Sequence, residues 1–177
     1  MANELMLEEV GLEDGQILAD SVRQWRADCQ AGQFKIGATT FRGSKLDLEL
    51  IGAQINEGEL FGYPHQKWLA LLFVDPDGVL SSLLFKTESL DNFEELRRSY
   101  RVQGETLLGK TIRATMAKRA SKASGNGYYA VEFEVIANGK YAEAIAQFRQ
   151  LHYSPQLFRP LENTPLLENG PGNGHGK

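Results

Sequence analysis

Apolar and polar residues alternate with a period of two through much of the chain, which is the pattern of β-strands with one wet face. One alternating stretch covers Phe34–Phe41, and a second, Lys45–Gln54, places its leucines opposite Asp47 and Glu49. Arg42-Gly43-Ser44 between the two stretches has the residues of a turn, so the pair is predicted to form a β-hairpin.

A run that is apolar on both faces, Lys67–Val74, predicts a strand near the centre of the sheet. The strong turn signal Asp75-Pro76-Asp77-Gly78 follows it, and Val79–Lys86 is predicted to return as the next strand. Two further strands are predicted at Leu107–Lys118 and Tyr128–Ile136, with a polar loop between them.

Helical spacing of apolar residues predicts three helices outside these strands. The first covers Gln16–Gln30 and ends at Gly32, and the third covers Lys140–Leu151. The second, Ser89–Arg101, has Ser89 as its N-cap, acids near its start and arginines near its end, as the helix dipole favours. The apolar residues of the three helices are Ile17, Leu18, Val22, Trp25 and Cys29; Leu90, Phe93, Leu96 and Tyr100; and Ala144, Ile145 and Phe148.

This order of elements predicts a mainly β protein, an OB-fold-like five-stranded barrel with an extra hairpin and peripheral helices. Barrels that bind oligonucleotides or oligosaccharides run three strands, a helix and two strands, and 89–101 takes the helix slot if 67–86 is one long bent strand. The predicted parts of the chain are an acidic arm and helix (1–32), the barrel (33–136), a C-terminal helix (137–153) and a Pro/Gly-rich tail (154–177) that is expected to be disordered.

Charge is segregated along the chain. The 177 residues carry a net charge of −4, yet residues 106–131 hold five basic side chains and no acid, while residues 1–22 hold six acids and no Lys or Arg. A basic segment in an acidic chain indicates a polyanionic partner, because the local field matters more than the total charge. A solvated basic hairpin, balanced by acids nearby in the fold, is the alternative interpretation.

The sequence argues against several classes of protein. No run approaches the roughly 20 apolar residues of a membrane-spanning helix, and the acidic start shows neither a secretory signal nor a transit peptide. The single cysteine, Cys29, allows no intrachain disulfide and no cysteine-cluster metal site, which fits a reducing cytoplasm. His65, His152 and His175 are scattered without catalytic spacing. We therefore expect a cytoplasmic protein that is not an enzyme and needs no cofactor.

The stretch Lys118-Arg119-Ala120-Ser121-Lys122-Ala123-Ser124-Gly125-Asn126-Gly127-Tyr128-Tyr129, together with the strand order, resembles bacterial and phage single-stranded-DNA-binding proteins of the OB fold. The resemblance covers roughly Gln33–Ile136. It implies ligand binding by the face of strands 2 and 3 and by the loops that join strands 1–2 and 4–5. In this chain those loops are predicted at Arg42–Lys45 and Arg119–Gly127, and both are cationic.

The chain also departs from the best-known bacterial members of that group. It has an extra segment before Gln33, and it ends in Gly174-His175-Gly176-Lys177 rather than in an acidic-aromatic tip. The resemblance therefore does not extend to the recruitment of repair or replication enzymes through the tail.

A site for single-stranded nucleic acid needs cations for the phosphates and flat faces for the bases, with stacking worth about 1–3 kcal/mol per base. Tyr128 is predicted on the wet face of its strand beside the basic loop, whereas Tyr129 lies on the apolar face. Phe41 is likewise opposite in phase to the apolar residues of its strand. The predicted nucleic-acid-binding residues are Phe41, Arg42, Lys45, Arg113, Lys118, Arg119, Lys122 and Tyr128.

Two other interpretations stay open. Carboxylates on the outer faces of the predicted second and fifth strands (Asp47 and Glu49, Glu132 and Glu134) would repel phosphates, which favours a protein-interaction or structural module of unknown partner. The segment Gly104–Thr111 spells a phosphate-binding P-loop, but a strand-like pattern follows it where a helix is required. The sequence decides neither between DNA and RNA nor whether the chain forms a homo-oligomer.

Overall fold

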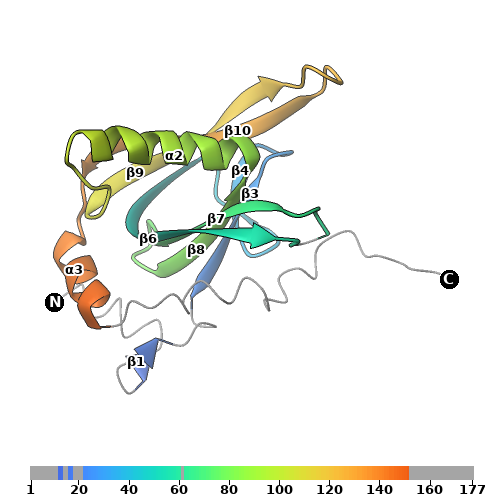
Figure 1. Cartoon of the computed structure of the whole chain (residues 1–177). Coiled ribbons are helices and arrows are strands. Elements are labelled where there is room, and N and C mark those ends of the chain that lie inside the picture. Colours follow the sequence, from blue (N-terminus) through green and yellow to red (C-terminus); the bar gives the residue numbers. More distant parts are fainter. Residues whose placement is uncertain (1–11, 14–15, 18–21, 61, 152–177) are drawn as a thin grey trace.

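The computed structural model describes residues 12–13, 16–17, 22–60 and 62–151. These residues form one curled sheet of eight strands with two helices, which confirms the predicted mainly β class (Figure 1). A separate pair of short strands, β1 (Leu12–Glu13) and β2 (Gln16–Ile17), lies outside this sheet. The elements of the main body are β3 (Arg23–Asp28), β4 (Gln33–Ile36), β5 (Thr40–Phe41), β6 (Lys45–Gly58), β7 (Gln66–Val74), β8 (Leu80–Lys86), α2 (Thr87–Val102), β9 (Lys110–Ala120), β10 (Gly127–Asn138) and α3 (Ala142–Leu151).

Strand β7 lies in the middle of the sheet, as its two apolar faces predict. The order across the sheet is β10-β9-β6-β7-β8-β3-β4-β5, and every neighbouring pair is antiparallel except the parallel pair β3 and β8. One face of β7 contributes Leu69, Leu71 and Phe73 to the larger of two buried clusters. The other face packs against Ile145 and Phe148 of α3, which confirms the predicted C-terminal helix.

The predicted helix over Gln16–Gln30 is wrong, and its second half forms β3. Val22 and Trp25 are three residues apart, a spacing that suits one face of a helix but the two opposite faces of an extended chain. Both are buried, Trp25 in the larger cluster and Val22 in the cluster beneath α3. Because both faces of the sheet are covered here, a strand carries apolar residues at helical spacing. Gly32, the predicted end of the helix, lies in the turn between β3 and β4.

The predicted hairpin between Phe34–Phe41 and Lys45–Gln54 is also wrong. The chain turns earlier, at Gly37, whose φ of 60° is a left-handed conformation that glycine adopts without strain. As a result β5 pairs with β4, whereas β6 pairs with β7 and β9. Together with β3, strands β4 and β5 make the sheet larger than the five-stranded barrel that the sequence predicts.

Helix α2 starts two residues earlier than predicted, and Ser89 is not its N-cap. The Ser89 hydroxyl instead accepts a 2.9 Å hydrogen bond from the backbone N–H of Val131 in β10, and Asn92 donates to the Val131 carbonyl. These bonds satisfy edge groups of β10 and attach the helix to the sheet. In the described part of the chain neither helix is long and apolar enough to cross a membrane. The predicted apolar stripe packs against the larger cluster: Leu90, Phe93, Leu96 and Tyr100.

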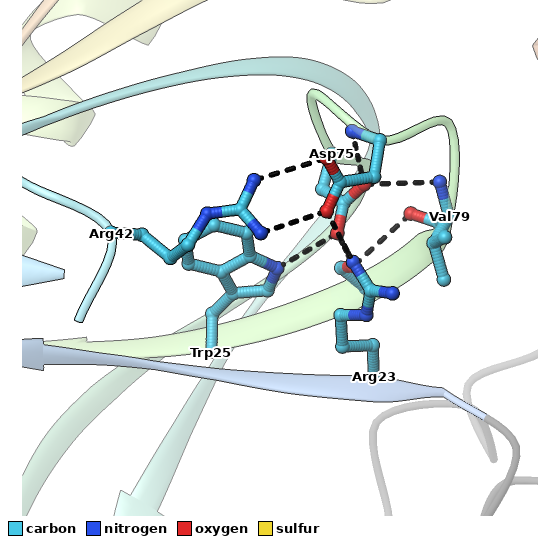
Figure 2. A network of polar contacts seen from close by, with 7 residues as sticks. Arg23, Trp25, Arg42, Asp75 and Val79 are labelled. Atoms are coloured by element: carbon cyan, nitrogen blue, oxygen red, sulfur yellow. Dashed lines mark hydrogen bonds and ion pairs between the residues drawn. The ribbon is translucent and has the colours of Figure 1, made fainter. Parts of the chain in front are cut away.

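The buried carboxylate of Asp75 ties β3 to the turn between β7 and β8 (Figure 2). It accepts hydrogen bonds from Arg23 Nη1 at 2.8 Å, Trp25 Nε1 at 3.1 Å and Ser81 Oγ at 3.0 Å. Two backbone N–H groups of the turn donate to its other oxygen. The predicted turn is thus confirmed, and a charged group organises it.

We predict that Asp75→Ala destabilises the protein by at least about 3 kcal/mol, because it leaves several buried donors without an acceptor. Asp77→Asn is the matched control, since Asp77 pairs with Arg23 and Arg42 at the surface, where such pairs contribute about 0–1 kcal/mol. Urea unfolding of both variants measures the difference. Equal losses would contradict the central role of the buried carboxylate.

Candidate nucleic-acid interface

Arg42 lies away from Tyr128, and its chain neighbours Phe41 and Lys45 are also among the predicted binding residues. Arg42 makes two hydrogen bonds to Asp77, of 2.9 and 3.0 Å, at the turn that precedes β8. Phe41 is 55% exposed on the edge strand β5, with Lys35 Nζ 4.7 Å from its ring centroid. Tyr128 contacts the chain just after the other end of β8. Seven strand residues span about 20 Å, so Arg42 and Tyr128 do not share one small site.

Arg113 and Lys45 lie where β9 pairs with β6, and they differ in their partners. The Arg113 guanidinium holds the Asp47 carboxylate through two hydrogen bonds of 2.7 and 2.9 Å, which raise the pKa of Arg113. Glu134 stands opposite Arg113 on β10. Lys45 is exposed and has no ion pair among the described residues. Arg113 is therefore ion-paired with Asp47, whereas Lys45 has no carboxylate partner among the described residues.

Arg119 joins β9 and β10 to the start of α2. Its Nε lies 2.7 Å from Glu88 and its Nη2 lies 2.6 Å from Glu132, while the Tyr128 hydroxyl donates a 2.9 Å hydrogen bond to Glu88. We call these four residues the Arg119 cluster. The hydrogen bond from Arg119 is the main reason that the pKa of Glu88 is lowered, and the bond to Glu88 raises the pKa of Tyr128. The cluster fixes the phenol oxygen of Tyr128 and leaves 38% of the residue exposed.

Lys118 and Lys122 belong to the hairpin of β9 and β10, which projects past the first residues of α2 (Figure 1). Both lysines are exposed, and neither forms an ion pair within the described residues. Backbone hydrogen bonds between Ser121 and Asn126 and between Gly125 and Ser121 close the loop. The β9–β10 hairpin thus carries the Tyr128 ring and two lysines that have no ion pair among the described residues.

The predicted faces of this hairpin are confirmed. Tyr129 packs against the larger cluster, and a Cβ at Gly32 would lie only 2.7 Å from its ring. Its backbone N–H donates to the carbonyl of Cys29, which attaches β10 to the turn after β3. Ile112, Ala114, Met116 and Val131 are buried, with Phe133 and Val135 packed against them.

A second aromatic group was missed by the sequence analysis. Tyr63, in the loop between β6 and β7, is 46% exposed and makes an edge contact with Trp68, with ring centroids 5.8 Å apart. Lys86, the last residue of β8, holds its Nζ 3.0 Å from the Tyr63 ring centroid. The signal that could have revealed it was a tyrosine between Gly62 and Pro64, which indicates an aromatic side chain presented on a turn.

The other chemistry weighed in the sequence lies elsewhere or lacks its context. The P-loop spelling runs from the end of α2 into β9, so no helix follows Lys110. Two shallow hollows of about 170 and 560 Å³ beside this segment share Leu108 and Arg149. They lie at the opposite end of β9 from Arg119. Across the described ranges no group of three or more His, Cys, Asp or Glu side chains is arranged to hold a metal ion.

Acid is expected to open the Arg119 cluster. Since the folded-state pKa of Glu88 is below its ordinary 4.5, the stabilisation is present above that value and is lost as the pH falls through the folded pKa. Between neutral pH and about pH 3, thermal stability should fall less in Glu88→Gln than in the wild type. Glu95→Gln, on the same helix, should keep the wild-type loss. Identical pH profiles for wild type and Glu88→Gln would contradict the expectation.

The residues of the hairpin offer a flat, exposed ring with a fixed hydroxyl and two lysines without an ion pair among the described residues, Lys122 in the loop and Lys118 opposite Tyr129. This is chemistry that suits phosphates and planar bases. The sequence as a whole matches no protein-family model and shows no significant similarity to a curated protein. The function of the chain is therefore inferred from this geometry.

Proposed function

We propose that the protein binds single-stranded nucleic acid, without catalysis, at the β9–β10 hairpin. The observation that carries the proposal is the exposed ring of Tyr128, anchored through its hydroxyl to Glu88 on the same hairpin as Lys122 and as Lys118, which stands opposite Tyr129 on the other face. Stacking of a base on an already oriented ring costs little conformational entropy. The two lysines supply the charge that phosphates need.

The acids on the outer face pose less of an obstacle than the sequence implies. Asp47 is paired with Arg113, Glu132 with Arg119, and the buried Glu49 accepts the backbone N–H groups of Lys140 and Tyr141 before α3. Their repulsion of a phosphate is therefore partly offset by the groups that they hold. The bound nucleic acid is expected to follow the β9–β10 hairpin rather than the centre of the outer face of the sheet.

Strand order gives separate support. Strands β6, β7 and β8 precede helix α2, and β9 and β10 follow it, with β9 beside β6. This is the order of three strands, a helix and two strands found in OB barrels, in which the loop between strands 4 and 5 binds ligand. In that assignment the basic loop stays between strands 4 and 5. The loop between strands 1 and 2 becomes residues 59–65 and replaces the predicted Arg42–Lys45.

A protein-interaction module is the second candidate, favoured by a different observation. Arg42, Arg113 and Arg119 are all paired with carboxylates, as expected of a solvated surface whose charges serve stability. The two candidates differ in what the lysines do. Only nucleic-acid binding makes Lys118 and Lys122 necessary for a salt-dependent affinity for oligonucleotides.

We predict that Lys118→Ala combined with Lys122→Ala weakens binding of labelled single-stranded oligonucleotides. The slope of log affinity against log salt should fall by about 0.7 for each phosphate that a lysine no longer neutralises. Arg113→Ala is the control, because Arg113 is already ion-paired with Asp47. Its removal should leave most of the salt slope of oligonucleotide binding unchanged. An unchanged slope in the double variant would remove the hairpin from the site and favour the protein-interaction candidate.

The ring of Tyr128 is tested separately from its hydroxyl. Tyr128→Ala should cost about 1–3 kcal/mol of binding, whereas Tyr128→Phe should cost much less, since stacking requires the ring. Tyr129→Ala should instead lower thermal stability by a few kcal/mol, because Tyr129 packs against the core. Titrations and melting curves on the three variants distinguish the cases. Equal stability losses at both positions, without a specific binding loss at Tyr128, would contradict stacking.

A further inference from the structure

We infer that Tyr63 and Lys86 form a second nucleotide subsite, at which a base stacks on the Tyr63 ring and the Lys86 ammonium contacts a phosphate of the same strand. The inference rests on the proposed function and extends it to a part of the surface that the hairpin does not include. It follows from three features: a supported exposed ring, a cation without an acidic partner, and a short connection to Tyr128.

The ring of Tyr63 is exposed yet supported. It meets Trp68 edge-on, at an interplanar angle of 65°, and Trp68 is 4% exposed with its Nε1 donating to the Gly58 carbonyl at 3.2 Å. The backbone N–H of Tyr63 also donates to the Leu60 carbonyl. A planar base can therefore stack on this ring without first ordering it.

Lys86 supplies a cation in the same place. Its Nζ lies 3.0 Å from the Tyr63 ring centroid and 5.9 Å from that of Trp68. Across residues 22–60 and 62–151, no carboxylate pairs with it. Lys86 is half-buried, and its contact with the ring is weaker than a charge-assisted hydrogen bond to a phosphate, so a phosphate can draw the ammonium away. Ring and cation are the two groups that one nucleotide requires.

The Tyr63 subsite is joined to Tyr128 by a short piece of backbone. Lys86, which covers Tyr63, is two residues before Glu88, which holds the Tyr128 hydroxyl. Two residues span at most about 7 Å. Thr87 between them has a φ of 49°, a strained conformation for a β-branched residue. A single nucleic-acid strand can thus pass from the Tyr63 ring to the Tyr128 ring across the junction of β8 and α2.

Oligothymidylate titrations of the full chain test the inference. Tyr63→Ala should weaken binding by about 5- to 150-fold, while Tyr63→Phe should retain most of the affinity. Lys86→Gln should weaken binding and lower the salt slope by about 0.7. Lys35→Gln is the matched control for Lys86→Gln, because Lys35 also lies over an aromatic ring, that of Phe41, but is paired with Asp28. Its affinity and salt slope should equal those of the wild type.

Fluorescence provides a readout that does not depend on affinity. The chain has two tryptophans, and Trp68 is the one in contact with Tyr63, so the part of the emission that Tyr63→Ala alters reports on this contact. Oligothymidylate should quench this emission. The Tyr63 subsite alone would be overturned by three results together. Tyr63→Ala would bind with wild-type affinity, oligothymidylate would leave the Trp68 emission unchanged, and Tyr128→Ala would still weaken binding. If the wild type binds no oligonucleotide, the proposed function itself is wrong.

Discussion

The buried carboxylate of Asp75 is the interaction on which the arrangement of the sheet depends. It collects donors from β3, from β8 and from the turn between β7 and β8, so a single charge holds three parts of the chain. Through Arg23 and Trp25 it fixes β3 beside β8 in the only parallel pairing of the described sheet. Strands β4 and β5 then extend the sheet from β3. This contact thus helps to hold the strand that supplies Trp25 to the larger cluster.

The position of β3 in the sheet also determines which parts of the chain contact β10. The turn after β3 accepts the backbone N–H of Tyr129, and the start of α2 bonds to both backbone groups of Val131. An edge strand with open backbone groups is thereby covered along part of its length. The hairpin end beyond these contacts carries Tyr128, Lys118 and Lys122, where side chains face water on a supported backbone.

On the described part of this surface the arginines are paired with carboxylates, whereas several lysines are not, and this difference decides which groups can contact an anion. Guanidinium groups form the bidentate or bridging contacts with carboxylates, as their planar geometry favours. The lysines Lys118, Lys122 and Lys86 have no carboxylate partner in the described part of the chain. Arginines thus hold the elements together, whereas these three lysines keep a charge that no carboxylate of the described residues pairs with. In the proposed interface, Arg119 positions the Tyr128 ring indirectly through Glu88 and leaves direct phosphate contacts to the lysines.

The sequence by itself determined the strands whose pattern depends only on local periodicity and turns: β7, β8, β9 and β10, the apolar stripe of α2, and the outward side of Tyr128. These follow from alternation and turn chemistry, which are read within a few residues. Tertiary structure decided the rest. Val22 and Trp25 form part of an extended segment because both faces of the sheet are covered, and Ser89 bonds to β10 instead of capping its helix. Ion pairing of Arg42, Arg113 and Arg119, and the meeting of Tyr63 with Lys86, join residues far apart in the chain, and no local pattern encodes which distant partner a side chain will contact.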